Sequence, residues 1–108
     1  MAQTTPELEQ IIQRFQQQLE KMGIHTKQIM IFGSQASGLA HEGSDIDLIV
    51  ISDDWTKLNQ RECLELLGIA AVRILEPVQA QGFTPAEVSL RRITPFWEHI
   101  IKEQAVLI

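Results

Sequence analysis

The segment between residues 31 and 51 constrains this chain most, because it joins two short apolar runs through a stretch of small and polar residues. The first run ends at Gly33 and Ser34, and after ten further residues the second begins with Asp45 and Asp47 before it continues as Leu-Ile-Val-Ile. Side chains of a strand alternate between its faces, so both aspartates are expected on the same face, roughly 7 Å apart along the strand. A strand that starts with two like charges is unusual and needs a chemical reason.

A divalent cation supplies such a reason for Asp45 and Asp47. Adjacent like charges near a core cost free energy unless something positive neutralises them. Oxygen ligands suit Mg²⁺ or Mn²⁺, which take one or two carboxylates and complete their shell with water and phosphate oxygens. The simple alternatives are that one acid caps a turn and the other points into solvent.

Gly33 and Ser34 have the chemistry of a phosphate site. A glycine lets the backbone approach a ligand closely, while a serine hydroxyl and free amides at a helix start suit a phosphate group. A Gly-Ser pair after a strand is also an ordinary turn when taken alone. Combined with the aspartates ten residues on, it predicts metal-assisted attack on a nucleoside triphosphate.

Composition narrows the classes of protein. A chain of 108 residues predicts a single domain, 1–108, and no apolar run approaches the roughly 20 residues of a membrane span. The net charge of −5, with scattered Arg and Lys, disfavours binding to a nucleic-acid polymer. A single cysteine, Cys63, and a polar, acidic N-terminus predict a cytoplasmic protein.

The order of predicted elements gives an α+β fold, a small mixed β-sheet flanked by helices. Thr-Pro pairs mark helix starts, since Thr caps the helix and Pro fits its first position. Helices are predicted to begin at Thr5-Pro6 and to end before Gly23, to run over 56–67 up to Gly68, and to begin again at Thr84-Pro85 and Thr94-Pro95. Strands are predicted at Gln28–Phe32, Asp45–Ser52 and Ala71–Gln79, with Ala105–Ile108 as a short edge strand.

The stretch "IFGSQASGLAHEGSDIDLIV" contains the pattern GSx10DxD. It closely resembles the minimal nucleotidyltransferase (MNT) branch of the DNA polymerase β-like nucleotidyltransferase superfamily, whose members are often encoded beside a helical HEPN protein. The segments "EPVQAQGFTPAEV" and "FWEHIIKEQAVLI" are also similar to the last strand and the C-terminal helix of that family. The resemblance implies the nucleotidyltransferase (polymerase β-like) fold.

The resemblance also implies roles for individual residues. Gly33 and Ser34 would hold the triphosphate, and Asp45 and Asp47 would bind the divalent metals, Mg²⁺ or Mn²⁺, as one cation or a cation pair. The family's third carboxylate stands on the neighbouring strand, where it completes the metal site and often acts on the attacking hydroxyl. Glu76 is the best match for this metal-binding and catalytic acid, and the alternative is a solvated acid at the strand end.

One position departs from the family pattern. Gln35 stands where the family often has Arg, so a phosphate-facing cation is missing. This departure leaves the affinity for triphosphate and the catalytic competence of the chain open.

The leading functional hypothesis is transfer of a nucleoside monophosphate to a hydroxyl, with release of pyrophosphate. For an MNT–HEPN pair the resemblance implies ATP as donor, a tyrosine of the HEPN toxin as acceptor, and an antitoxin role. The alternative is a catalytically weak or inactive nucleotide-binding subunit that neutralises a partner by binding it. We expect a partner surface on the terminal helices, made of Phe15, Met22, Phe96 and Trp97; the alternative is that these residues pack internally in a monomer or homo-oligomer.

Overall fold

The computed structural model describes residues 6–33 and 45–107. The predicted cap residue Thr5, the phosphate-site residue Ser34 and the departure at Gln35 therefore lie outside the described residues.

The centre of the fold is a four-stranded sheet with strand order β3-β2-β1-β4. Its strands are β1 (Gln28–Phe32), β2 (Ile46–Ile51), β3 (Val78–Phe83) and β4 (Val106–Leu107). β1 pairs antiparallel with β2 and with β4, while β2 pairs parallel with β3. The predicted α+β class with a mixed sheet is confirmed, and so is the short edge strand near the C-terminus.

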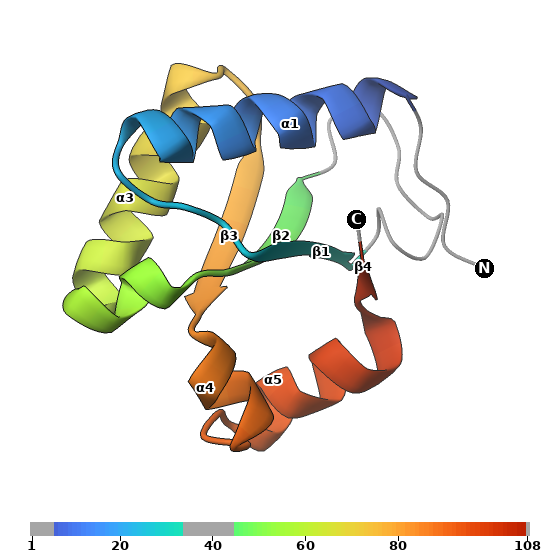
Figure 1. Ribbon diagram of the computed structural model, residues 1–108. Coiled ribbons are helices and arrows are strands. Elements are labelled where there is room, and N and C mark those ends of the chain that lie inside the picture. The colour runs from blue at the N-terminus through green and yellow to red at the C-terminus, as the bar shows by residue number, and fades with distance from the viewer. Residues whose placement is uncertain (1–5, 34–44, 108) are drawn as a thin grey trace.

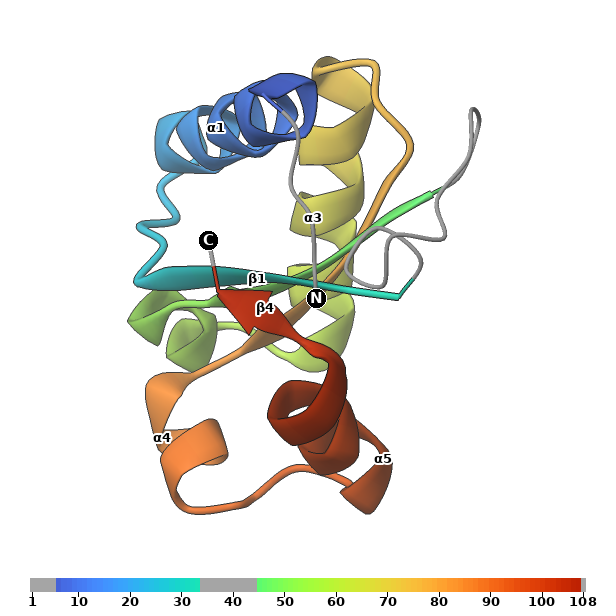
Figure 2. The ribbon, with the colours of Figure 1, turned by 90° about the vertical axis from the view of Figure 1, so that its right-hand side faces the viewer.

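Helices cover both faces of this sheet (Figure 1). Figure 2 shows α1 on one side of β1 and both α4 and α5 on the other. None of the helices in the described part of the chain is long and apolar enough to cross a membrane. The helical elements are α1 (Pro6–Lys21), η1 (Asp53–Lys57), α3 (Gln60–Arg73), α4 (Pro85–Ser89), α5 (Pro95–His99) and the π-helix η2 (Ile100–Gln104).

Alternation along β2 divides the apolar residues between two cores. Leu48 and Val50 pack with α1 and α3 in the first core. Ile49 and Ile51 face the other way and pack with Phe83 and η2 in the second. Each such buried side chain contributes about 1.5–3 kcal/mol relative to an exposed one. The predicted alternation is confirmed, and it places Asp47 on the side of the second core.

The C-terminus of α1 is closed by Gly23 with a left-handed backbone, φ 89°. The N–H of Gly23 donates to the carbonyl of Glu20 at 3.0 Å, and the N–H of Ile24 donates to that of Leu19 at 2.9 Å. This pair of bonds is the Schellman arrangement, which favours glycine at that position. The predicted helix end is confirmed.

The loop after α1 is joined to the end of β2 by polar contacts. The Ser52 hydroxyl donates to the carbonyl of His25 at 2.7 Å. The N–H of His25 in turn donates to Asp54 Oδ2 at 2.7 Å, and this backbone hydrogen bond lowers the pKa of Asp54. The contacts hold β1 at its start, because β1 begins three residues after His25.

The predicted helix 56–67 is wrong at both ends. α3 begins after Asn59, whose side chain forms a capping box with Glu62, and it continues through Gly68 to Arg73. Glycine inside a helix costs about 1 kcal/mol relative to alanine, and burial of Ala70 in the first core offsets that cost. Tertiary packing therefore carries the helix past the residue that was expected to end it.

The predicted strand Ala71–Gln79 is wrong for the same reason. Its first three residues belong to α3, and β3 starts only at Val78. Pro77 lies directly before β3, where a residue without an N–H costs no ladder hydrogen bond. Its carbonyl accepts a hydrogen bond from the N–H of Ile46 at 2.9 Å, which aligns the starts of β2 and β3.

The expected partner surface on the terminal helices is largely absent. Phe15 is fully buried, and Met22 packs against the first core. Trp97 makes edge-to-face ring contacts with Phe32 at 5.4 Å and packs against the second core. Of this set only Phe96 is exposed, with 63% of its surface accessible.

Candidate functional site

Gly33 and Asp47 lie against each other where β1 ends and β2 begins. Phe32 is the pairing partner of Asp47 across these two strands, so Gly33 follows directly beside it. A Cβ atom at Gly33 would collide with Asp47 Oδ2 and would lie 3.3 Å from Cγ. The backbone of Gly33 is also left-handed, φ 72°. Glycine is needed here both for space and for conformation.

The two aspartates differ in their surroundings. Asp45 is exposed just before β2, while Asp47 is half-buried within it. Burial raises the pKa of Asp47, and the negative charge of Asp45 raises it further. The folded protein therefore carries an unfavourable concentration of negative charge at this edge, which a cation would relieve. Two carboxylates of this kind fit a hard divalent ion.

Gln79 is the side chain that β3 adds to this group. It is the pairing partner of Asp47, and its Nε2 donates to Asp45 Oδ2 at 2.8 Å. The sequence reasoning missed this residue because it began the strand inside α3. Pro77 was the available signal, since a proline in a ladder strand is confined to its edge or its start. With β3 started after Pro77, position 79 falls opposite Asp47.

Comparison with known proteins agrees with this fold. A family model of the nucleotidyltransferase domain matches residues 8–102. The chain belongs to this family. A solved structure from Sulfolobus solfataricus, described as a "putative nucleotidyltransferase", superposes with a TM-score of 0.53 at 18% identity, covering 99% of this chain and 89% of the other. At that identity the likeness concerns the fold. Comparison with curated proteins finds no match.

Membership of the nucleotidyltransferase family supports nucleotidyl transfer as the activity, with a nucleotide as substrate. The residue types where β1 ends and β2 begins suit that chemistry. Asp45 and Asp47 are acids, and the Asp47 carboxylate occupies the space that a side chain at Gly33 would need. Ser34, the expected phosphate ligand, lies outside the described residues.

Glu76 does not join the two aspartates of the nucleotidyltransferase. It lies in the turn before β3, and its Oε1 is 3.4 Å from Arg14 Nη2 of α1. Within residues 6–33 and 45–107, no group of three His, Cys, Asp or Glu side chains is placed to hold a metal ion. The assignment of Glu76 to the neighbouring strand is therefore wrong, because the strand begins two residues later.

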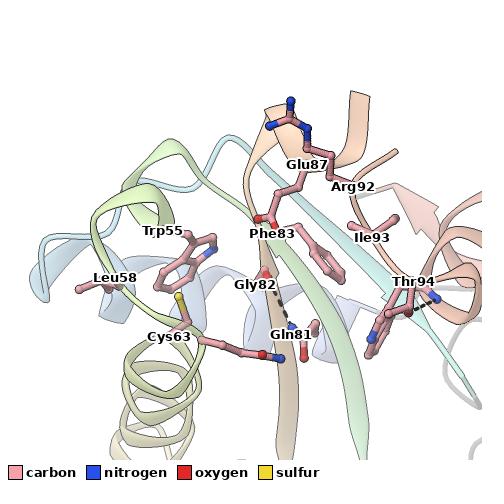
Figure 3. A pocket seen from close by; sticks show the side chains of 12 residues that line it. Trp55, Leu58, Cys63, Gln81, Gly82, Phe83, Glu87, Arg92, Ile93 and Thr94 are labelled. Atoms are coloured by element: carbon pink, nitrogen blue, oxygen red, sulfur yellow. Dashed lines mark hydrogen bonds between the residues drawn. The ribbon is translucent and has the colours of Figure 1, made fainter. Parts of the chain in front are cut away.

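A separate cavity of about 290 Å³ lies at the other end of β3 (Figure 3). Gln81 and Phe83 both line it. They pair with Ile49 and Ile51, whereas Gln79 pairs with Asp47, so the lining residues of β3 lie about 7–13 Å along the strand from the register of Asp47. Cys63 also lines this cavity. Its pKa is raised by burial and by nearby acids, which favours the unreactive thiol.

Gly82 makes room for Trp55 beside this cavity. A Cβ at Gly82 would lie 2.8 Å from Trp55 Nε1 and 2.9 Å from its Cε2. The same Nε1 donates to the carbonyl of Val50 at 3.1 Å. The Trp55 indole therefore packs closely against β3, and this contact is separate from the aspartates.

Proposed function

We propose that this nucleotidyltransferase transfers the nucleoside monophosphate of ATP to a hydroxyl group of a helical partner protein. The acceptor is a tyrosine of a HEPN-type toxin, and the protein acts as its antitoxin. The observation that carries the proposal is the contact of Gly33 with Asp47, which brings the predicted phosphate turn and the predicted metal ligands to one edge of the sheet.

The reaction forms a bond between the acceptor oxygen and the α-phosphorus. The bond from the α-phosphorus to the bridging oxygen breaks, pyrophosphate leaves, and the hydroxyl proton passes to a carboxylate or to water. Positioning and charge stabilisation provide most of the catalysis in phosphoryl chemistry of this kind. The chain would contribute the two carboxylates, the glycine at position 33 that leaves room for Asp47, and the Ser34 hydroxyl as a phosphate ligand.

Asp45 and Asp47 would hold Mg²⁺, or Mn²⁺ in its place. When bound, the ion neutralises charge on the phosphate oxygens and orients the displacement. Gly33 has no side chain to displace Asp47 from this role. Among residues 6–33 and 45–107 the acids at this edge are too few to build an all-protein metal site, which agrees with the usual binding of Mg²⁺ through one or two carboxylates plus phosphates.

The outer surface of α3 is the better candidate for the partner interface. Leu64 and Val72 lie eight residues apart, about two helical turns, so they share a face. Val72 is 71% exposed and Leu75, just past the helix end, is 85% exposed. Leu75 also has a left-handed backbone, φ 58°, which costs a leucine about 1–2 kcal/mol. Exposed apolar side chains held in a strained turn support a role in binding.

Labelled ATP tests the transfer. The protein is incubated with Mg²⁺ and a co-expressed HEPN-type partner, in parallel reactions with ATP labelled at the α- or the γ-phosphate. We expect the α-label alone to enter the partner, together with a mass gain of whole AMP groups. The Asp47→Asn variant is the control and should transfer no label. Transfer of the γ-label, or full transfer by the Asp47→Asn variant, would refute the proposal.

Charge substitutions test the interface. Val72→Glu and Leu75→Glu should prevent co-elution with the partner in size-exclusion chromatography, because each buries a charge in an apolar contact. Leu90→Glu is the matched control, since Leu90 is 58% exposed at the end of α4. Equal loss of binding in all three variants would indicate a general effect of charge and contradict this surface.

A second candidate function is favoured by Gln79. An amide in register with Asp47 supplies neither the charge nor the basicity of an acid, as expected for a subunit that binds nucleotide and neutralises its partner without turnover. Toxin neutralisation separates the two candidates. If Asp45→Asn and Asp47→Asn protect cells as well as the natural protein does, neutralisation needs binding only.

A further inference from the structure

Gln79 and Gln81 share the face of β3 that carries the site. Val78 packs in the first core and Phe83 in the second, so alternation places residues 79 and 81 on the same side as Phe83. That is also the side of Asp47 and Ile49, which are the pairing partners of Gln79 and Gln81. Both polar positions of β3 on this face are therefore occupied by neutral amides.

Gln79 is closer to the aspartates than Gln81 is, both in strand pairing and in its hydrogen bond. It pairs with Asp47 across strands that lie about 4.8 Å apart, and it donates to Asp45 Oδ2 at 2.8 Å. Gln81 instead donates weakly to the carbonyl of Gly82 at 3.5 Å. A carboxylate at position 79 would make a group of three acids, whereas one at position 81 would not reach Asp45.

The amide at position 79 has two consequences for cations. In the described part of the chain it leaves the site with two negative charges, which match a single divalent ion. Its N–H group cannot ligate a metal, so Gln79 must release Asp45 or rotate before its own oxygen faces an ion. Before any ion arrives, the same hydrogen bond holds the exposed Asp45 side chain beside Asp47.

We propose that Gln79 is a specificity-determining residue that limits the site to one divalent cation and makes its uptake depend on the nucleotide. The inference rests on the proposed use of Asp45 and Asp47 as metal ligands. With two carboxylates and a neutral amide, the protein alone binds the ion weakly. Phosphate oxygens supply the missing ligands, so ion and triphosphate bind together.

Mn²⁺ titration followed by electron paramagnetic resonance tests this without any turnover. The natural protein should bind one Mn²⁺ weakly, and more tightly when a non-hydrolysable ATP analogue is present. Gln79→Glu keeps the shape of the side chain and adds a charge. It should bind Mn²⁺ without nucleotide at least about tenfold more tightly, as expected for a new oxygen ligand. It should also take up a second ion with the analogue.

Gln81→Glu is the matched control, because it adds the same charge to the same face two residues away. Its affinity for Mn²⁺ should rise much less than that of Gln79→Glu, because a carboxylate two residues farther along the strand adds charge without reaching the ion as a ligand. Gln79→Ala guards against a folding defect in the charged variant: it should still bind a single ion with the analogue, with reduced affinity because Asp45 loses its hydrogen bond. Equal Mn²⁺ affinity in Gln79→Glu and the natural protein would overturn the inference, and so would an equal gain in Gln81→Glu.

Asp47→Asn separates this inference from the proposed function. If Mn²⁺ binding is unchanged in Asp47→Asn, the aspartates are not ligands and the proposed function fails together with the inference. If Asp47→Asn loses Mn²⁺ while Gln79→Glu gains nothing, the metal site stands and only the role of Gln79 is wrong.

Discussion

Replacing Gly33 with alanine should remove binding of metal and nucleotide while leaving most of the protein folded. The new Cβ would occupy the place of Asp47 Oδ2, and the half-buried Asp47 side chain has solvent into which it can rotate. Gly23→Ala is the matched control. Gly23 is also left-handed, φ 89°, but a Cβ there meets nothing within 4 Å.

The stability cost should be similar in the two variants. An alanine held in the left-handed region costs about 1–2 kcal/mol. A change of 1 kcal/mol lowers Tm by roughly 4–8 °C in a domain of this size, so each variant should melt roughly 5–15 °C below the natural protein. A much larger loss in Gly33→Ala would mean that Asp47 does not move and that the new methyl group is overpacked, which costs about 1–3 kcal/mol more.

Binding should then distinguish the two alanines. Calorimetric titration with Mn²⁺ and a non-hydrolysable ATP analogue, well below both melting temperatures, should show unchanged affinity for Gly23→Ala. Affinity should fall at least about tenfold for Gly33→Ala, the scale expected when a metal ligand is misplaced. If Gly33→Ala binds as the natural protein does, or if Gly23→Ala loses binding equally, the assignment of Gly33 and Asp47 to one site is wrong.

Three other predictions concern the two aspartates, Gly82 and Asp54. Asp45→Asn and Asp47→Asn should each abolish transfer, with Tm unchanged or higher because like-charge repulsion is relieved; the double variant should be little worse than either, and additive losses in a transfer assay would contradict a shared role. Gly82→Ala should destabilise the fold by about 1–3 kcal/mol in urea unfolding, because the methyl group meets Trp55, while nucleotide affinity stays normal; a stable variant would show that the indole can shift. The pKa of Asp54 is lowered, so its ionised form stabilises the folded state above the ordinary pKa of about 3.9, and this contribution is lost as pH falls through the lowered folded value. Asp54→Asn should therefore be less stable than the natural protein at neutral pH, and the difference in stability should narrow in acid. A difference that does not change with pH would exclude this linkage.

Local chemistry made part of this fold predictable. β1 was predicted to the residue, Gln28–Phe32, because a short Ile-rich run between turn residues leaves few alternatives. The end of α1 followed from Gly23, since a left-handed helix end selects glycine. The helix start predicted at Thr84-Pro85 is likewise present, and a capping box between Thr84 and Glu87 closes it. In each case the deciding residues lie within a few positions of one another.

Packing between distant segments decided what the pattern left ambiguous. The local pattern predicted a helix end at Gly68, but α3 continues past it because Ala70 and Ala71 are buried in the first core. Phe15 was predicted to belong to the partner surface, but it is fully buried. The apolar side chains that do remain exposed, such as Leu75, could not be separated from core residues by composition alone.

The sequence by itself determined that Asp45 and Asp47 share one face of a strand and that this strand follows Gly33-Ser34 after ten residues. Strand alternation and spacing are properties of the local chain. The tertiary structure decided which residue stands beside them. Parallel pairing of β2 with β3, set by contacts between segments about thirty residues apart, places Gln79 opposite Asp47 and leaves Glu76 paired with Arg14. A shift in where a strand begins changes the charge of the site, and only the pairing of the strands specifies that start.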